Sequence, residues 1–218
     1  MGVMKSTFKE LITGSLLVIS LFYVNPLHAQ SSKTPYLDNP IILDSASSFL
    51  IPVRYDVTIF SSSDKLAIFG NYYANIVFYN VQTDSSKILF KKDTYIMDFK
   101  IPFYYDKSVY DHLGNSNRTK KCVILRVKDV DYNRNGRIDE NDPDILYVTD
   151  NLGQKLRCLS TKDENVLSIQ IFEKQNFALV KFQRDNNHNG KYDYRDDEYF
   201  YAKLDFATLT LGNKIELK

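Results

Sequence analysis

The stretch that decides the fold is residues 169–182, which read IQIFEKQNFALVKF. Two runs rich in β-branched and aromatic residues, 169–172 and 177–182, flank the polar segment 173–176. Such runs, separated by three to five polar residues, are typical of a β-hairpin. We therefore predict two antiparallel strands here. No long segment beyond the first 29 residues has an apolar period of 3.6 that would favour a helix.

The hairpin pattern recurs along the chain. Further strand-like runs, separated by polar turns, lie at 56–60, 66–69, 76–79, 87–90, 95–105, 122–127, 145–148, 156–159 and 199–211. They group into three units of about four strands, at about 51–93, 94–162 and 163–218. The predicted fold class is therefore all-β, with antiparallel four-stranded, propeller-like repeats in one domain over 30–218. Closed propellers have 4–8 blades, so a partial or open array is one alternative and a β-sandwich another.

The composition is that of an ordinary globular protein and excludes several classes. The 218 residues are 44% hydrophobic and 25% charged, which argues against a disordered chain. Lys and Arg number 28 against 27 Asp and Glu, a formal net charge of +1. A protein that binds nucleic acid through its phosphates needs a concentrated positive charge. We therefore expect no nucleic-acid partner.

The first 29 residues have the layout of a secretory signal peptide. Lys5 and Lys9 precede an apolar run over 11–24, and Leu27-His28-Ala29 ends in a small residue typical of a cleavage site. Cleavage there would leave 28 − 2 = 26 basic and 27 − 1 = 26 acidic residues. No later apolar run is long enough to span a bilayer. We expect a periplasmic or extracellular protein with no membrane span after cleavage.

Export brings the two cysteines, Cys122 and Cys158, into an oxidising compartment, where a disulfide is one possibility. The strand assignment places one strand between them, which is too far for easy bridging. The favoured interpretation is two buried free thiols that pack as small hydrophobic side chains.

Two twelve-residue segments carry the chemistry. Residues 131–142 read DYNRNGRIDEND and residues 185–196 read DNNHNGKYDYRD. Both fit D-x-[DN]-x-[DN]-G at their first six positions, and both have oxygen-bearing side chains at positions 1, 3, 5, 9 and 12. Ca²⁺ takes 6–8 oxygen ligands, and glycine at position 6 permits the sharp turn that wraps the loop around an ion.

We therefore predict two Ca²⁺ sites, with backbone carbonyls at position 7 and side chains at the other positions. The predicted ligands are Asp131, Asn133, Asn135, Arg137, Asp139 and Asp142 in the first loop, and Asp185, Asn187, Asn189, Lys191, Asp193 and Asp196 in the second. Neither loop has a bidentate Glu at position 12, so the expected affinity is weak, about 10⁻⁴–10⁻³ M, and the role structural. The alternative is two solvated Asn-Gly turns without metal.

The loops resemble the calcium loops of EF-hands and dockerins, and the shorter loops of integrin-type propeller blades. EF-hands and dockerins imply flanking helices, whereas the flanks here are strand-like, so we expect loops set in β-hairpins. Residues 144–157, DILYVTDNLGQKLR, look like a hairpin of Tol-type periplasmic propeller repeats. That resemblance implies an exported bacterial protein that presents a broad binding surface.

The functional hypothesis is a secreted calcium-binding β-repeat protein that acts as a binding module for a protein or a glycan at the cell envelope. The alternative is an exported hydrolase whose catalytic residues the sequence does not identify. The chain has three His, and no nucleophile-elbow, P-loop or dinucleotide motif. A cleft that gathers ionisable groups away from the two loops would favour the enzyme.

Overall fold

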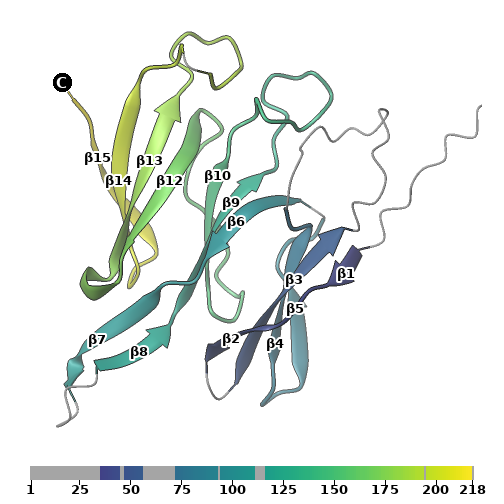
Figure 1. The fold of residues 1–218 in the computed structure, drawn as a ribbon, viewed down its shortest axis with the longest axis vertical. Coiled ribbons are helices and arrows are strands. Elements are labelled where there is room, and N and C mark those ends of the chain that lie inside the picture. Colours follow the sequence, from purple (N-terminus) through teal and green to yellow (C-terminus); the bar gives the residue numbers. More distant parts are fainter. Residues whose placement is uncertain are drawn as a thin grey trace, which may run out of the picture. The chain divides into compact units, whose positions relative to one another are not determined.

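The computed structural model describes residues 35–44, 47–55, 72–92, 94–110, 116–193 and 195–217. Over these ranges the chain forms strands joined by turns, with one short 3₁₀ segment and no α-helix (Figure 1). Every strand pairing is antiparallel. The predicted all-β class is confirmed, and its propeller-like arrangement stays a prediction. The predicted signal peptide, and the runs at 56–60 and 66–69, lie outside the described residues.

The first sheet has the order β1-β3-β4-β5, with β2 also paired to β3. Its strands are β1 (Pro35–Leu37), β2 (Ile41–Asp44), β3 (Ser48–Tyr55), β4 (Asn75–Asn80) and β5 (Ser85–Ile88). The strand predicted at 87–90 begins two residues earlier and ends at Ile88, because the turn after β4 occupies only residues 81–84.

The second sheet has the order β11-β10-β9-β6. Its strands are β6 (Tyr95–Lys100), β9 (Cys122–Lys128), β10 (Ile145–Asp150) and β11 (Arg157–Cys158). Strand β9 is buried on both faces: Val123 and Leu125 belong to a core shared with the first sheet, and Ile124 to a core shared with the third. A continuous apolar run, without polar alternation, is what burial on both faces requires.

The third sheet contains the hairpin that the sequence predicts at residues 169–182. It has the order β12-β13-β14-β15, formed by β12 (Glu164–Phe172), β13 (Phe177–Arg184), β14 (Tyr199–Asp205) and β15 (Thr210–Ile215). The 3₁₀ segment η1 (Glu173–Gln175) turns the chain between β12 and β13, and Asn176 completes the turn in the left-handed region at φ 58°. The predicted pair of antiparallel strands is therefore confirmed.

A separate two-stranded ribbon, β7 (Phe103–Tyr110) and β8 (Ser116–Lys120), leaves the second sheet. The predicted run 95–105 is divided at residues 101–102, because Pro102 has no N–H to donate to a ladder. The sequence placed a polar insertion over 106–121, whereas the structure pairs much of that segment in the ribbon.

The two cysteines are free. Strand β10 lies between them, as predicted: Cys122 is opposite Asp150, and Cys158 is opposite Tyr147. Cys122 is buried, and burial raises the pKa of its thiol to about 12. Cys158 is exposed, which corrects the expectation of two buried thiols. The reason is that β11 is a two-residue edge strand with no neighbour beyond it.

Candidate metal-binding loops

Each of the two predicted calcium loops connects a pair of antiparallel strands. The first loop follows β9 and leads into β10, with Val127 opposite Ile145 as the last pair before it. The second follows β13 and leads into β14, with Gln183 opposite Tyr199. Both loops project beyond the ends of their strands at the top of the view (Figure 1). The calcium-type sequence is thus set in β-hairpins, without the flanking helices of an EF-hand.

The two loops adopt the same backbone turns. Position 4 is left-handed in both, with φ 59° at Arg134 and 54° at His188. Position 6 is glycine with φ 83° at Gly136 and 74° at Gly190. Residues with side chains rarely adopt positive φ, so glycine at position 6 spares each bend a second strained residue beside position 4. The equivalent angles show that the shared sequence specifies a shared conformation.

The opening carboxylates make the same two hydrogen bonds. In each loop, Oδ1 of the aspartate at position 1 accepts the N–H of position 5, and Oδ2 accepts the N–H of position 6. The distances are 3.1 and 2.8 Å for Asp131, and 3.1 and 2.9 Å for Asp185. The carboxylate at the start of the loop therefore fixes the glycine turn halfway through it.

The asparagine side chains repeat in the same way. Asn133 and Asn187 at position 3 each accept the N–H of position 5, at 3.0 Å in both loops. Asn135 and Asn189 at position 5 each accept the N–H of position 7, at 2.8 Å in both loops. Each side-chain oxygen is thus held by a backbone donor, and an amide oxygen has a second lone pair for another partner.

The closing aspartates are buried. Asp142 is 1% exposed and Asp196 is 0% exposed. Oδ2 of each accepts the N–H of position 9, at 2.8 Å from Asp139 and 3.1 Å from Asp193. The closing carboxylate therefore ties the end of each loop back to position 9.

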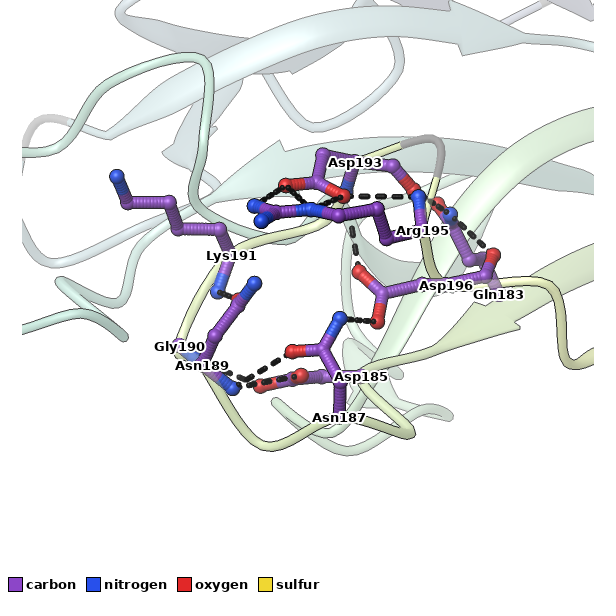
Figure 2. A network of polar contacts seen from close by, with 9 residues as sticks. All are labelled: Gln183, Asp185, Asn187, Asn189, Gly190, Lys191, Asp193, Arg195 and Asp196. Atoms are coloured by element: carbon purple, nitrogen blue, oxygen red, sulfur yellow. Dashed lines mark hydrogen bonds and ion pairs between the residues drawn. The ribbon is translucent and has the colours of Figure 1, made fainter.

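The residues at position 7 are predicted to contribute their backbone carbonyls rather than their side chains. Both residues, Arg137 and Lys191, are exposed. Figure 2 shows the Lys191 side chain extending away from the carboxylates of the second loop.

Buried donors that the sequence analysis did not identify hold the far end of each loop. Lys128, 6% exposed, donates to the carbonyl of Asp142 and forms an ion pair with Asp144 at 3.1 Å. Gln183, 5% exposed, donates to the carbonyls of Asp193 and Asp196, at 2.8 and 2.9 Å. The sequence signal that could have identified these two donors is a long polar side chain near the end of an otherwise apolar strand that leads into the loop.

Some predicted ligands also have partners that a metal ion would replace. Hydrogen bonds from the Arg195 side chain and from its backbone N–H lower the pKa of Asp193 to about 2 (Figure 2). For Asp139, burial raises the pKa, but hydrogen bonds from Asn141 and Asn135 outweigh it and the net shift is downward. Both carboxylates are therefore in their charged, ligand form at neutral pH.

The two loops also contact each other, which the sequence did not predict. The rings of Tyr132 and Tyr192 lie 5.6 Å apart between centroids, and the Tyr132 hydroxyl donates to Oδ2 of Asp185 at 3.2 Å. A side chain on Gly190 would come within 3.5 Å of the Asn133 backbone. Burial and the nearby Asp185 carboxylate raise the pKa of Tyr132 to about 12, so its hydroxyl keeps its proton and remains a donor.

One cavity gathers ionisable groups, and it lies at the base of the first loop. It has a volume of about 330 Å³, and its lining includes Arg126, Lys128, Glu140 and Asp144. Asp144 pairs with Arg126 at 3.0 Å and with Lys128 at 3.1 Å. Of its lining residues, Glu140 belongs to the first loop and Lys128 holds the end of that loop, so the cavity adjoins the predicted calcium site.

Within the described part of the chain, no three His, Cys, Asp or Glu side chains form a group that could hold a metal ion. Each predicted ligand set contains three Asp carboxylates and two Asn amides, and the three carboxylates of a loop are not gathered into such a group. No helix in the described ranges is long and apolar enough to cross a membrane. Comparison with protein-family models, curated proteins and solved structures finds no match to this chain.

Proposed function

We propose that each loop binds one Ca²⁺ ion and that the two ions stabilise the hairpins β9–β10 and β13–β14. The observation that supports this most strongly is the duplication of the loop hydrogen bonds. Two segments that begin 185 − 131 = 54 residues apart make the same backbone-to-side-chain bonds from positions 1, 3, 5, 9 and 12. A plain Asn-Gly hairpin turn needs two residues and none of these carboxylates.

The donor set selects the class of ion. Carboxylate, amide and carbonyl oxygens are the ligands of Ca²⁺, while Zn²⁺ favours His and Cys, which neither loop offers at these positions. Mg²⁺ is a poorer fit because it requires a near-ideal octahedral arrangement of ligands. A loop whose six candidate donors are carboxylates, amides and a carbonyl suits the more flexible coordination of Ca²⁺. Each loop carries three aspartates, at positions 1, 9 and 12, so a divalent cation would offset negative charge within the loop.

The experiment is calorimetric titration of the full chain with Ca²⁺, together with melting curves at rising Ca²⁺ concentration. An ion that binds only the folded state stabilises it by RT ln(1 + [Ca²⁺]/Kd), which is about 2.7 kcal/mol at one hundred times Kd. We expect two ions per chain, and a rise in Tm that disappears when Asp131→Ala and Asp185→Ala are combined.

The matched control is Asp150→Ala. Asp150 also accepts two backbone N–H groups in a hairpin turn, at 3.2 and 2.7 Å, but it lies outside both loops. This variant should lower Tm equally with and without Ca²⁺. A wild-type chain whose Tm does not respond to Ca²⁺ would refute the proposal.

We further propose that the protein is exported and acts as a binding module at the cell envelope, for a protein or a glycan. Its support is a row of exposed large side chains on the third sheet: Tyr199, Tyr201 and Ile215 are 41%, 39% and 58% exposed. Tyr201 and Ile215 are opposite each other in the sheet, and Lys181 covers the Tyr199 ring at 4.6 Å. Exposed apolar groups gathered on one surface are typical of interaction sites. Retention on isolated envelope fractions should fall when Tyr199→Ser and Tyr201→Ser are combined, and unchanged retention would contradict this role.

A further inference from the structure

The residue Tyr132 contacts a predicted ligand in each loop. Its backbone N–H donates to Oδ1 of Asp142 at 2.8 Å, and Asp142 closes the first loop at position 12. Its hydroxyl donates to Oδ2 of Asp185 at 3.2 Å, and Asp185 opens the second loop at position 1. One residue therefore connects a carboxylate of the first site to a carboxylate of the second, across 53 positions of the sequence.

We propose that Tyr132 couples the two loops, so that Ca²⁺ in one loop raises the affinity of the other. This inference rests on the proposed calcium function. An ion in the first loop would fix the Asp142 carboxylate and thereby the Tyr132 backbone. The second loop would then receive a hydroxyl already aimed at Asp185 and would lose less freedom on binding. Because coupling is reciprocal, an ion in the second loop favours binding in the first by the same factor.

The surroundings of Tyr132 give the link its rigidity. Its ring lies 5.6 Å from the Tyr192 ring, at an interplanar angle of 35°. Tyr192 is fixed in turn, since its hydroxyl donates to the carbonyl of Lys162 at 2.7 Å. The Tyr132 ring therefore rests on an anchored neighbour, and a shift of its backbone is passed on to its hydroxyl.

The link is built into one loop only. Position 2 of the second loop is Asn186, whose amide donates to Asp197 at 2.9 Å rather than to the first loop. In the second loop, Oδ1 of the closing carboxylate, Asp196, accepts the side-chain amide N–H of Asn187 from within the same loop. Tyr132 is accordingly the position to change, and substitution at Asn186 provides a matched control.

The experiment compares stepwise Ca²⁺ affinities by calorimetry in wild type, Tyr132→Phe and Asn186→Ala. Phe keeps the ring and removes the hydroxyl. In wild type we expect the second ion to bind about fivefold more tightly than the first, or more, since typical couplings lie between about 5-fold and 150-fold. Tyr132→Phe should still bind two ions but with independent affinities, and Asn186→Ala should behave as wild type.

Asp131→Ala supplies a second measurement that does not depend on the Tyr132 variant folding. With the first loop disabled, the second should bind its ion about fivefold more weakly than the cooperative step in wild type. Adding Tyr132→Phe to this variant should not weaken Ca²⁺ binding by the second loop any further, because the first loop then holds no ion whose effect Tyr132 could transmit. Two ions bound independently by wild type, or cooperativity retained in Tyr132→Phe, would overturn the coupling and leave the proposed calcium function intact. Absence of calcium binding by wild type would overturn both.

Discussion

The first loop and the second loop share their sequence template, their left-handed positions and their backbone hydrogen bonds, yet they differ in what lies around them. A charged amine, Lys128, holds the end of the first loop, whereas a neutral amide, Gln183, holds the end of the second. Arg195 pairs with the carboxylate at position 9 of the second loop, where the first has Asn141 bonded to Asp139. The template thus sets the loop conformation, whereas the strand residue before the loop and position 11, which the template leaves open, set its electrostatics.

The largest expected difference concerns the residues that hold the loop ends. Lys128→Met removes a buried cation and leaves Asp144 with Arg126 as its remaining ion-pair partner. Breaking a buried pair costs about 3–5 kcal/mol when the other charge is left unpaired, and less here because Arg126 still pairs with Asp144, although the hydrogen bond to the Asp142 carbonyl is also lost. Gln183→Leu removes hydrogen bonds to two carbonyls but leaves no charge behind, at a cost of about 1–3 kcal/mol. We therefore expect Lys128→Met to lower the free energy of unfolding more than Gln183→Leu, as measured by urea denaturation without Ca²⁺. Equal losses would show that the charge at the first loop has no special role.

A smaller effect is expected at position 9, where the loops differ by one guanidinium. Arg195→Gln removes the exposed ion pair with Asp193, so Ca²⁺ should bind the second loop more tightly. Such a pair is weak, and its removal corresponds to a gain in affinity of about 1.4-fold to fivefold. Asn141→Gln in the first loop is the matched control and should leave the affinity of the second loop unchanged. Tighter binding in both variants would mean that the gain does not come from releasing Asp193.

The same substitution has a pH signature. The pKa of Asp193 is lowered from 3.8 to about 2, so the stability that its charged form contributes is complete above pH 3.8 and is lost as pH falls towards about 2. Arg195→Gln removes the first cause of that shift, and the carboxyl should then titrate nearer 3.8. Titration of the Asp193 carboxyl carbon by NMR measures both values. An unchanged pKa would show that the Arg195 side chain is not the main cause.

The parts of the site that could be predicted are those determined by neighbours in sequence. The five predicted side-chain ligands and the glycine turn lie within twelve residues, so the spacing alone indicates the loop and its repeated hydrogen bonds from side chain to backbone. The strands on either side followed from apolar runs such as 122–127 and 177–182. The link from Tyr132 to Asp185 could not be predicted, because it depends on how two sheets pack and on a side chain at a position that the loop template leaves open.

Two features of the fold escaped the sequence for similar reasons. Strand β8 reads SNRTK, and β7 contains Asp106, Lys107 and Ser108, a polar composition that indicates a loop from sequence alone. Cys158 lies in an apolar run, 156–159, that is typical of a core strand, but its strand is at the edge of the sheet and two residues long. In both cases the tertiary position of the strand, rather than its composition, decides the outcome.

The double-sided burial of β9 has a consequence for how the protein opens. Strand β9 is paired on both edges, with β6 and β10, and packs against two cores, so its amides exchange with solvent only in a large opening that is close to global unfolding. Strand β14 has an exposed face that includes Tyr199 and Tyr201, and its hairpin can open in a smaller, less costly event. We therefore expect the hairpin that carries the first loop to open less often than the hairpin that carries the second, so that an ion in the proposed sites would protect the second hairpin from transient opening and proteolysis more than the first.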